Sequence, residues 1–499
     1  MENGINWGKR RLIGIVLGPA LFALLLLLPV PADMSPEAMK VAAVAALMAT
    51  FWMTEAIAIP ATALLPIALF PMLGVMPTPK VTAAYANHLI YLFLGGFLIA
   101  VTIEKWHLHK RIALHTIQIV GVTPQRIVLG FMLATAFLSA WISNTATAML
   151  MLTIGLAVLS QATAASAKLA TGESQGNDLR HSTFGTTLML AIAYSASIGG
   201  VATLIGTPPN AILAGIIEKN YGYTIGFAQW MMFGLPLSLV MLFVTWYYLT
   251  RFVMGKDVAQ LPGGRQAISD QLKALGPMSS QEKKVLAVFV FVAAAWILRG
   301  LFDFEFLNNV KDSSIAIFAA LLLFVIPSDW KNGEFLLDWD TAARIPWDII
   351  ILFGGGFALA SGFESSGLTP WIANELVILQ GIGVLFTVLA VVLIVIFLTE
   401  VTSNTATASL ILPVVGAFAL AVQIHPYYLM VAVAIAASFA FMLPVATPPN
   451  AIVFSSRQIT IPQMAKAGIW LNLIGAVVIT AFVVLVLPRI FDLLVSEVH

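Results

Sequence analysis

Two short polar motifs each occur twice in this chain. The hexapeptide Ser-Asn-Thr-Ala-Thr-Ala occupies residues 143–148 and 403–408, and the pentapeptide Thr-Pro-Pro-Asn-Ala occupies residues 207–211 and 447–451. All four copies lie inside long apolar stretches, where a backbone group without a hydrogen-bond partner is costly in hydrocarbon. Polar breaks at two matching places in membrane helices are typical of a site that binds a solute or an ion at the bilayer midplane.

The Pro-Pro motifs predict that two apolar helices are broken. Each proline lacks a backbone donor and clashes with the turn before it, and the residue preceding a proline is pushed out of the α region. Because proline is well tolerated at the first position of a helix, we expect a half-helix over 211–217 whose N-terminus faces the break, and the same arrangement after Thr447. Ser143-Asn144 and Ser403-Asn404 are good N-caps for the arms that follow them. Four helix N-termini should therefore meet near the midplane.

Four such N-termini favour an anion. Each presents free N–H groups and about half a positive charge, so an anion needs no lysine or arginine, and the four motifs contain neither. The side chains that can add hydrogen bonds to carboxylate oxygens are Asn144, Thr145, Thr147, Asn404, Thr405 and Thr407. Helices that end at the breaks leave carbonyl groups unpaired, and these oxygens suit a hard monovalent cation such as sodium. The pattern predicts an anion pocket between two oxygen-lined cation pockets, as a cotransporter requires.

The composition is that of a polytopic membrane protein. Hydrophobic residues make up 60% of the 499 residues and charged residues only 10%, whereas soluble domains carry roughly 25% charged residues. The net charge of +1 argues against a nucleic-acid partner, which would need a basic patch. Since the chain has no cysteine, disulfides, thiol catalysis and iron–sulfur sites are excluded.

The apolar segments predict an all-α protein with about 11 membrane crossings, each of roughly 20 residues or slightly fewer. These segments are 12–30, 38–54, 56–74, 88–104, 183–217, 229–250, 285–301, 313–327, 347–373, 427–456 and 465–488. Two more apolar stretches, 124–160 and 383–422, carry the Ser-Asn-Thr motifs at their centres, and the polar break predicts re-entrant hairpins there. With a cytoplasmic N-terminus and an external C-terminus, most basic residues lie on the cytoplasmic side. The exceptions are Lys40, Lys80, Lys219, Arg299, Lys311 and Arg489.

The similarity of the two halves extends beyond the motifs. Residues 92–97 (Leu-Phe-Leu-Gly-Gly-Phe) match residues 352–357 (Leu-Phe-Gly-Gly-Gly-Phe) at the offset of 260 residues that also relates the two hexapeptides. In the expected topology the two copies run in opposite directions, so we predict two inverted repeats joined by the polar segment 251–284. An extra polar linker near 163–182 lengthens the first repeat. We expect the glycine runs to be close-packing surfaces between helices.

Glu400 is a charged residue in an otherwise uncharged hairpin arm, just before Ser403. An ionisable group at membrane depth is a functional candidate. The equivalent position in the first half is Ala140, so the repeat does not require the carboxylate. Three interpretations remain open: hydrogen bonds that support or couple the hairpin tip, handling of a proton or cation, and a place near the membrane interface without a special role.

These motifs resemble the two hairpin tips and two Pro-Pro breaks of the divalent anion/sodium symporter family, which includes sodium-coupled dicarboxylate and citrate transporters. Residues 52–56 (Trp-Met-Thr-Glu-Ala) and 104–111 (Glu-Lys-Trp-His-Leu-His-Lys-Arg) also look like those of the family. The resemblance implies a homodimer in a bacterial plasma membrane, whose transport domain slides along a scaffold domain as an elevator. The implied scaffold parts are 1–120 and 285–380, the transport parts are 121–250 and 381–499, and the cytoplasmic linker is 251–284.

The binding residues of the family fall on matching positions of this chain. One sodium site would use Ser139, Ser143, Asn144 and the Gly206 carbonyl, and the second would use Thr399, Thr402, Asn404 and the Ala446 carbonyl. The substrate carboxylates would meet Asn144, Thr145, Asn404 and Thr405, with Thr207, Thr447 and Pro448 at the breaks closing the pocket. The resemblance thus implies sodium symport of a C4-dicarboxylate such as succinate, malate or fumarate, or of citrate, with sodium as coupling ion and no other cofactor.

Other functions remain open. Some members of the family exchange one dicarboxylate for another without sodium, and they share these motifs. An intramembrane enzyme would need a paired acid and base, a nucleophile with its base, or a metal cluster at membrane depth, and only Glu400 approaches this, without a partner. A receptor or channel is less favoured, because no sizeable soluble domain is present and broken helices suit occlusion better than a continuous pore.

Overall fold

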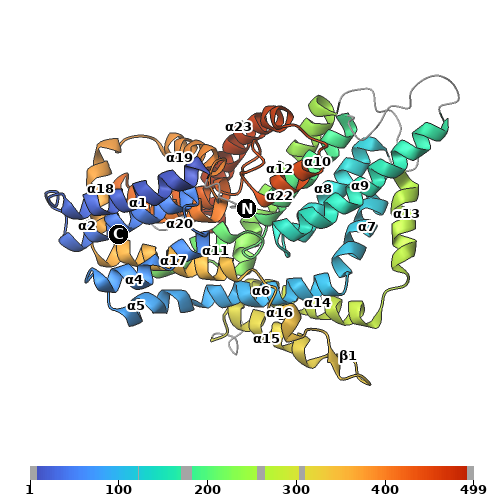
Figure 1. Ribbon diagram of the computed structural model, residues 1–499, viewed down its shortest axis with the longest axis horizontal. Coiled ribbons are helices and arrows are strands. Elements are labelled where there is room, and N and C mark those ends of the chain that lie inside the picture. Colours follow the sequence, from blue (N-terminus) through green and yellow to red (C-terminus); the bar gives the residue numbers. More distant parts are fainter. Residues whose placement is uncertain (1–7, 122, 170–182, 255–263, 303–308, 492–499) are drawn as a thin grey trace, which may run out of the picture.

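The structure of the chain is a computed structural model that describes residues 8–121, 123–169, 183–254, 264–302 and 309–491 (Figure 1). Both chain ends, and parts of the expected polar linkers at 170–182 and 255–263, lie outside these ranges. Within them nearly every element is a helix, as the apolar segments predict.

In the first part of the chain, polar side chains cap the starts of two helices. Its elements are α1 (Lys9–Leu27), α2 (Pro36–Thr54), α3 (Ile59–Thr62), α4 (Leu65–Met72), α5 (Thr78–Ala83), η1 (Ala84–Ala86), α6 (His88–Lys105) and α7 (Leu108–Val120). Ser35 accepts a hydrogen bond from the backbone N–H of Ala38, and Asn87 accepts one from Leu89, so α2 and α6 begin where these side chains cap them. The expected span 56–74 is split, because α3 ends and α4 begins around Ala63, whose carbonyl accepts a hydrogen bond from the Tyr85 hydroxyl.

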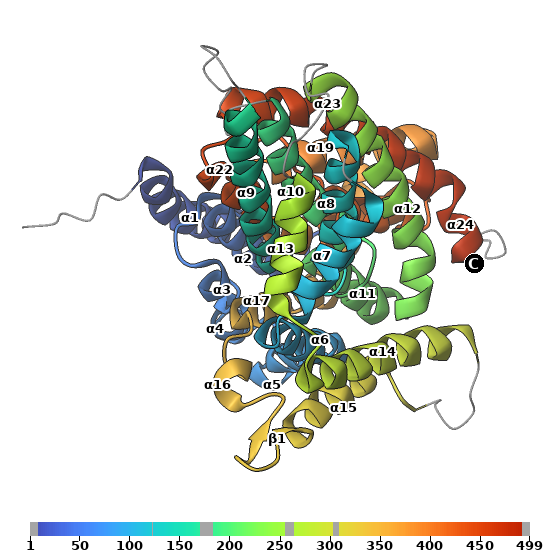
Figure 2. The ribbon, with the colours of Figure 1, turned by 90° about the vertical axis from the view of Figure 1, so that its right-hand side faces the viewer.

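The next part contains the first hairpin and the first broken helix. Its elements are α8 (Pro124–Ser139), α9 (Asn144–Leu169), α10 (Thr183–Gly200), α11 (Pro208–Tyr221), α12 (Phe227–Tyr248), the short π-helix η3 (Leu249–Val253) and α13 (Gly264–Leu275). The expected hairpin over 124–160 is formed by α8 and α9, and the expected helix over 183–217 is formed by α10 and α11. Figures 1 and 2 both show α8, α9 and α10 side by side.

The third part carries the connecting helices. Its elements are α14 (Ser280–Leu301), α15 (Asp312–Val325), β1 (Pro327–Asp329), β2 (Glu334–Phe335), α16 (Trp339–Ala342), α17 (Trp347–Ser365), α18 (Leu368–Leu376) and η5 (Val377–Leu379). The one departure from the expected all-α fold among the described residues is a short antiparallel hairpin of β1 and β2 between α15 and α16. The expected span 347–373 is also too long, since α17 ends at Ser365 and Gly367, at a φ of 79°, turns the chain into α18.

The last part repeats the plan of the second. Its elements are α19 (Val384–Thr399), α20 (Asn404–Ala421), α21 (Pro426–Ala436), α22 (Pro448–Ser455), α23 (Ile461–Leu485) and α24 (Leu487–Ile490). The expected hairpin over 383–422 is formed by α19 and α20, and the expected helix over 427–456 is formed by α21 and α22. Each broken helix therefore leaves a non-helical segment between its halves.

Length and composition single out 9 helices of the described ranges that could cross a membrane, or up to 10 if one bent pair counts as a span. That pair joins Leu368–Leu379 to Val384–Thr399 at an angle of 117°. The count includes the hairpin arms α9 and α20 and leaves out the broken helices α10–α11 and α21–α22. It therefore establishes a polytopic membrane protein, while the expected total of about 11 crossings with two re-entrant hairpins stays a prediction.

The glycine runs are contact surfaces between helices, as predicted. A Cβ atom on Gly95 of α6 would lie 2.6 Å from the backbone of Ala316 in α15, and one on Gly355 of α17 would lie 2.5 Å from the Ala63 carbonyl oxygen. Both distances are shorter than real Cβ contacts, so only glycine allows these helices to approach so closely. Figure 2 shows α6, α14 and α15 packed together below the hairpins.

Candidate functional site

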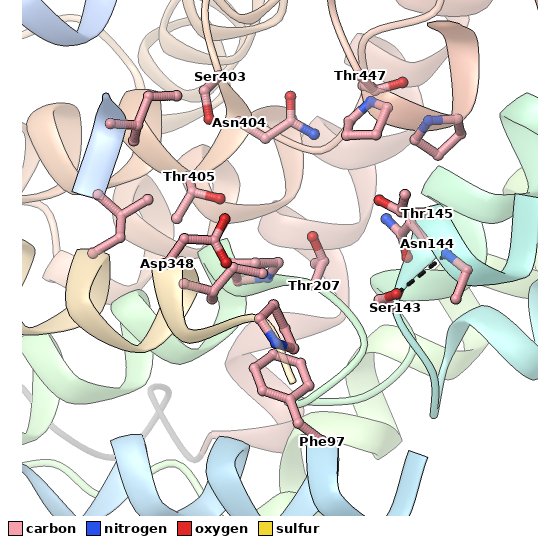
Figure 3. A pocket seen from close by; sticks show the side chains of 18 of the residues that line it. Phe97, Ser143, Asn144, Thr145, Thr207, Asp348, Ser403, Asn404, Thr405 and Thr447 are labelled. Carbon is pink, nitrogen blue, oxygen red and sulfur yellow. Dashed lines mark hydrogen bonds between the residues drawn. The ribbon is translucent and has the colours of Figure 1, made fainter. Parts of the chain in front are cut away.

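Four helix N-termini meet around one cavity of about 760 Å³, as the repeated motifs predict (Figure 3). They are the starts of α9 at Asn144, α11 at Pro208, α20 at Asn404 and α22 at Pro448, and all four residues line the cavity. Each start follows a residue in an extended or irregular conformation. At α9 and α20 this leaves the first backbone N–H groups free of partners within the helix. The expectation of free N–H groups is wrong for α11 and α22, because each begins with two prolines, which have no N–H, so these two helices contribute only the partial charge of their dipole. The cavity is therefore surrounded by four ends of partial positive charge.

The side chains that the resemblance assigns to the substrate all line this cavity, whereas Thr147 and Thr407, also expected to bond carboxylate oxygens, are buried and are not among its lining residues. The assigned side chains are Asn144, Thr145, Thr207, Asn404, Thr405, Thr447 and Pro448. Figure 3 shows Asn144 and Thr145 on one side, Asn404 and Thr405 on the other, and Thr207 between them. The far wall includes aromatic and aliphatic side chains of α6 and α17, among them Phe97 and Leu352. The structure thus brings the two halves of the chain to one polar centre, opposite a wall in which apolar side chains are joined by the carboxylates of Glu104 and Asp348.

A cluster of oxygen atoms lies behind Asn144. The hydroxyl of Ser139, at the end of α8, is 2.5 Å from Asn144 Oδ1 and 2.7 Å from the carbonyl oxygen of Ala196 in α10. A hydroxyl has one proton to donate, so it can satisfy only one of these two oxygens at a time. Three oxygen atoms in contact with one proton among them are an arrangement that a small hard cation would stabilise.

The second half repeats this cluster. The hydroxyl of Thr399, at the end of α19, is 2.8 Å from Asn404 Oδ1 and 2.9 Å from the carbonyl oxygen of Ala437. Thr399 is fully buried, as Ser139 is, and neither is among the residues that line the cavity. The hydroxyls of Ser139 and Thr399 therefore lie behind the cavity wall, and each contacts an asparagine that lines the cavity.

Gly200 leaves a small space at the first of these clusters. A Cβ atom on Gly200 would lie 2.7 Å from Asn144 Oδ1 and 3.0 Å from the carbonyl oxygen of Gly206. The Gly206 carbonyl, one of the expected sodium ligands, is therefore close to Asn144. Two of the three atoms nearest to the position of this Cβ atom are oxygens and the third is Asn144 Nδ2 at 3.2 Å, so the two oxygens fit a small cation there.

The other expected ion ligands, Ser143, Ala446 and Thr402, do not share one position relative to the cavity. Ser143 and Ala446 line the cavity, whereas Thr402 is not among its lining residues. The hydroxyl of Thr402 is 2.6 Å from that of Thr407 and donates to the carbonyl of Leu398 at 2.8 Å. Because its hydroxyl is engaged within the hairpin, a contribution of Thr402 to the cation site stays a prediction.

The expected N-caps are formed in only one of the two hairpins. The Ser143 hydroxyl accepts a hydrogen bond from the backbone N–H of Ala146 at 3.2 Å and caps α9 as predicted. Ser403 occupies the equivalent position before α20, but its side chain makes no capping hydrogen bond, so that part of the prediction is wrong. Thr447 caps α22 by accepting from Asn450, while Thr207 makes no such bond before α11.

The asparagines of the two Pro-Pro motifs hold the breaks. Asn210 donates its amide N–H to the carbonyl of Thr203 at 2.8 Å, and Asn450 donates to the carbonyls of Ala440 and Leu443 at 3.0 Å each. Both side chains are fully buried, so they satisfy carbonyl groups that the broken helices leave without partners. This role was not assigned from the sequence, although the repetition of the asparagine in both copies was the available signal.

Glu400 is enclosed by protein, with 3% of its surface exposed. Its carboxylate accepts hydrogen bonds from the backbone N–H groups of residues 441–443 and from the amide of Asn472. These bonds favour the interpretation in which Glu400 supports the hairpin tip. Among the described residues, no basic side chain forms an ion pair with it.

Charged side chains that were not singled out from the sequence also line the cavity. They are Glu55, Glu104, Arg344 and Asp348. Figure 3 shows Asp348, from the first turn of α17, near Thr405. Three acidic groups and one basic group favour cations, so any bound anion depends on the helix N-termini rather than on these charges. Glu55 and Glu104 lie in the two further segments that look like the family, whereas Asp348 carried no signal in the sequence.

Comparison with known proteins finds relatives along the whole chain. The family model described as sodium:sulfate symporter transmembrane region matches residues 9–489. A sodium-dependent dicarboxylate transporter of Staphylococcus saprophyticus, SdcS, is 44% identical over 497 residues, which cover 99% of this chain and 94% of that protein. The protein of the same name from Staphylococcus aureus is 44% identical over 492 residues, covering 98% and 93% of the two chains.

Two solved structures share the fold at low sequence identity. The YdaH transporter of Alcanivorax borkumensis superimposes with a TM-score of 0.56 and 12% identity, over 95% of this chain and 98% of that one. MtrF of Neisseria gonorrhoeae, described as an antimetabolite efflux pump, gives a TM-score of 0.56 and 11% identity, over 96% and 95%. At such identities the likeness concerns the fold alone, because one fold hosts many functions.

Proposed function

Because the chain belongs to the divalent anion/sodium symporter family, we propose that it carries a C4-dicarboxylate across a bacterial plasma membrane together with sodium. Membership of this family identifies the chain as an integral membrane transporter and not an enzyme. Succinate, malate and fumarate are the proposed substrates, with citrate as a larger alternative. The relatives of 44% identity, named as sodium-dependent dicarboxylate transporters, support both the anion class and the coupling ion.

The single observation that carries this proposal is the meeting of four helix N-termini at one cavity. The N–H groups at the starts of α9 and α20, together with the partial charges of all four N-termini, can bind two carboxylates without a buried lysine or arginine. Asn144 with Thr145 lies on one side and Asn404 with Thr405 on the other, so each end of a dicarboxylate would meet one pair. Thr207, Thr447 and Pro448 would close the pocket at the breaks.

Sodium would occupy the two oxygen clusters. The first site would use Ser139, Ser143, Asn144 and the Gly206 carbonyl, which the space beside Gly200 supports. The second site would use Thr399, Thr402, Asn404 and the Ala446 carbonyl. In each site the asparagine would face the ion through Oδ1 and the substrate through its remaining donors. Sodium would then fix the side chain that binds the anion.

The transport step would be a movement of the hairpins and broken helices along a scaffold. The cavity supports this, because its far wall belongs to α6 and α17, whose glycines are packed tightly into other helices. We propose the scaffold at 1–120 and 285–380 and the transport domain at 121–250 and 381–499, joined at 251–284. Two inverted repeats, a homodimer through the scaffold, a cytoplasmic N-terminus and an external C-terminus complete the proposal.

Uptake of labelled succinate into proteoliposomes tests the function. An inward sodium gradient should drive succinate above its equilibrium concentration, while choline at equal ionic strength should not. Uptake that is indifferent to sodium and depends on succinate inside the vesicles would replace the symporter with a sodium-independent exchanger. Purified protein in vesicles without either activity would remove dicarboxylate transport altogether.

A further inference from the structure

The carboxylate of Glu400 is surrounded by hydrogen-bond donors only. Oε1 accepts from the backbone N–H of Phe441 at 2.7 Å, from that of Met442 at 2.9 Å and from Asn472 Nδ2 at 2.7 Å, and Oε2 accepts from the N–H of Leu443 at 3.0 Å. Three successive backbone N–H groups that point at one anion form a concave anion site. The ionised carboxylate is the form that accepts all four bonds. Glu400 therefore ties the tip of the second hairpin to the break of the second broken helix.

The hydrogen bonds of Glu400 are linked to the proposed second cation site through Leu443. Leu443, whose N–H is held by Glu400, accepts hydrogen bonds at its carbonyl from the N–H of Ala446 at 3.2 Å and from Asn450 Nδ2 at 3.0 Å. The carbonyl of Ala446 is a proposed sodium ligand. Thr399, directly before Glu400, contacts the carbonyl of Ala437 at the other end of the same segment. The end of α19 thus holds the segment between α21 and α22 at two places.

The first half has a hydrogen-bonded link at the equivalent place, but there the side chain comes from the break and the backbone group from the hairpin tip. Ala140 corresponds to Glu400 and Thr203 corresponds to Leu443. The Thr203 hydroxyl donates to the carbonyl of Ala140 at 2.5 Å and accepts from the N–H of Gly206 at 3.1 Å. In the first half a side chain of the break reaches the backbone of the hairpin tip. In the second half a side chain of the hairpin tip reaches the backbone of the break.

We propose that Glu400 is a positioning residue for the second sodium site, which does for the Ala446 carbonyl what Thr203 does for the Gly206 carbonyl. The role rests on the proposed function of that site. Glu400 touches neither the ion nor the substrate, and it acts by holding the backbone that presents the ligand. Without it, the N–H groups of Met442 and Leu443 would lose the carboxylate that accepts from them, and the N–H of Phe441 would keep only its 3.3 Å bond to Asn472 Oδ1. Each unpaired group is costly inside a membrane protein.

The equivalence of the two ties offers a direct test. Glu400→Ala removes the tie, and the double variant Glu400→Ala with Leu443→Thr installs in the second half the residue pair that serves the first. Sodium affinity is measured on purified protein without substrate, by thermal shift against a choline control, and amide hydrogen exchange is followed in residues 437–447. We expect Glu400→Ala to weaken apparent sodium affinity by at least about fivefold and to speed the exchange. We expect the double variant to regain most of both.

Each outcome decides the proposal. Unchanged sodium affinity in Glu400→Ala, or a double variant that recovers slow exchange but not affinity, overturns it. If Glu400→Ala does not fold, recovery of folded, sodium-binding protein by the added Leu443→Thr supports it, whereas unchanged affinity in the milder Asn472→Ala overturns it. The exchange measurement also separates this test from the proposed function: a parent chain that neither binds nor transports sodium removes the function, while fast exchange in Glu400→Ala still reports the tie.

Discussion

The hydroxyl oxygen of Thr207 lies 3.3 Å from the hydroxyl oxygen of Ser438. Thr207 is the last residue before α11, and Ser438 follows the end of α21, so this contact joins the two breaks at their buried sides. Each residue is also the neighbour of a carbonyl in an oxygen cluster, Gly206 for Thr207 and Ala437 for Ser438. The two proposed sodium sites are therefore connected by one hydrogen bond between side chains.

The contact predicts coupling between the two breaks. Thr207→Val and Ser438→Ala each remove one partner of a hydrogen bond worth about 1 kcal/mol, so each should lower both unfolding stability and sodium affinity. The double variant should be little worse than either single one, because both remove the same interaction. Thermal unfolding in detergent and sodium titration measure this. The exposed Thr82→Val is the matched control, and fully additive losses would show that the contact couples nothing.

The space beside Gly200 predicts a sharp steric effect. Gly200→Ala would place a methyl group 2.7 Å from Asn144 Oδ1, where the first sodium ion is proposed. Sodium affinity and sodium-driven uptake should both fall, while folding is kept if the helix shifts by a few tenths of an ångström. Gly226→Ala is the control, since a Cβ atom there meets nothing within 4 Å. Equal sodium titrations for the two variants would place the ion elsewhere.

Transport should require each of the two cavity asparagines, Asn144 and Asn404. Asn144→Ala and Asn404→Ala each remove one proposed ion ligand and one proposed substrate donor, so succinate uptake should fall by at least about tenfold, which corresponds to about 1.4 kcal/mol. Folding is checked by gel filtration and melting temperature. Asn332→Ala, in the exposed turn between β1 and β2, should leave uptake unchanged. Normal transport by both cavity variants would mean that the polar centre is not the binding site.

Sodium and substrate should bind cooperatively although most of their ligands differ. An ion in either cluster fixes an asparagine that also faces the cavity, so sodium should tighten succinate binding, commonly by 1–3 kcal/mol in coupled systems. Thermodynamic linkage then requires succinate to tighten sodium by the same factor. Calorimetric titrations of succinate in sodium and in choline at equal ionic strength measure it. Equal affinities in the two salts would favour the sodium-independent exchanger.

The four helix N-termini predict which protonation form of the substrate binds. Four N-termini with no basic side chain in their motifs should select the dianion, so apparent succinate affinity should weaken as pH falls from about 7.5 to about 5.5, through the second carboxyl pKa of the substrate. Fumarate, whose carboxyl groups are more acidic, should be less affected over the same range. Initial uptake rates against total substrate at each pH give the answer. Uptake that rises as pH falls would point to a proton carrier in the protein.

The breaks and hairpin tips were predictable because proline physically forbids a continuous helix, and because Ser, Asn and Thr repeat at matching places. Hydrogen bonds at the hairpin tip were among the interpretations of Glu400, but its partners were not predictable, since they are backbone groups of an apolar run, residues 441–443, that no side-chain pattern marks. The split at Ala63 and the turn after Ser365 escaped for a similar reason. Tyr85 and Gly367 fix them through tertiary contact and a positive φ rather than through hydrophobic periodicity.

The reversed polarity of the two ties limits how this chain can change by single substitutions. Losing Glu400 first would leave the N–H groups of Met442 and Leu443 without an acceptor and that of Phe441 with only Asn472. Gaining a hydroxyl at position 443 first would keep the hydrogen bonds of Glu400 and, by the proposal above, make the carboxylate dispensable. The two substitutions are therefore tolerated only when the change at position 443 comes first, although both orders end at the same sequence. Grafting the first hairpin tip onto the second without its companion break would likewise fail. The two halves share the same motifs, yet a segment of one cannot replace its counterpart in the other.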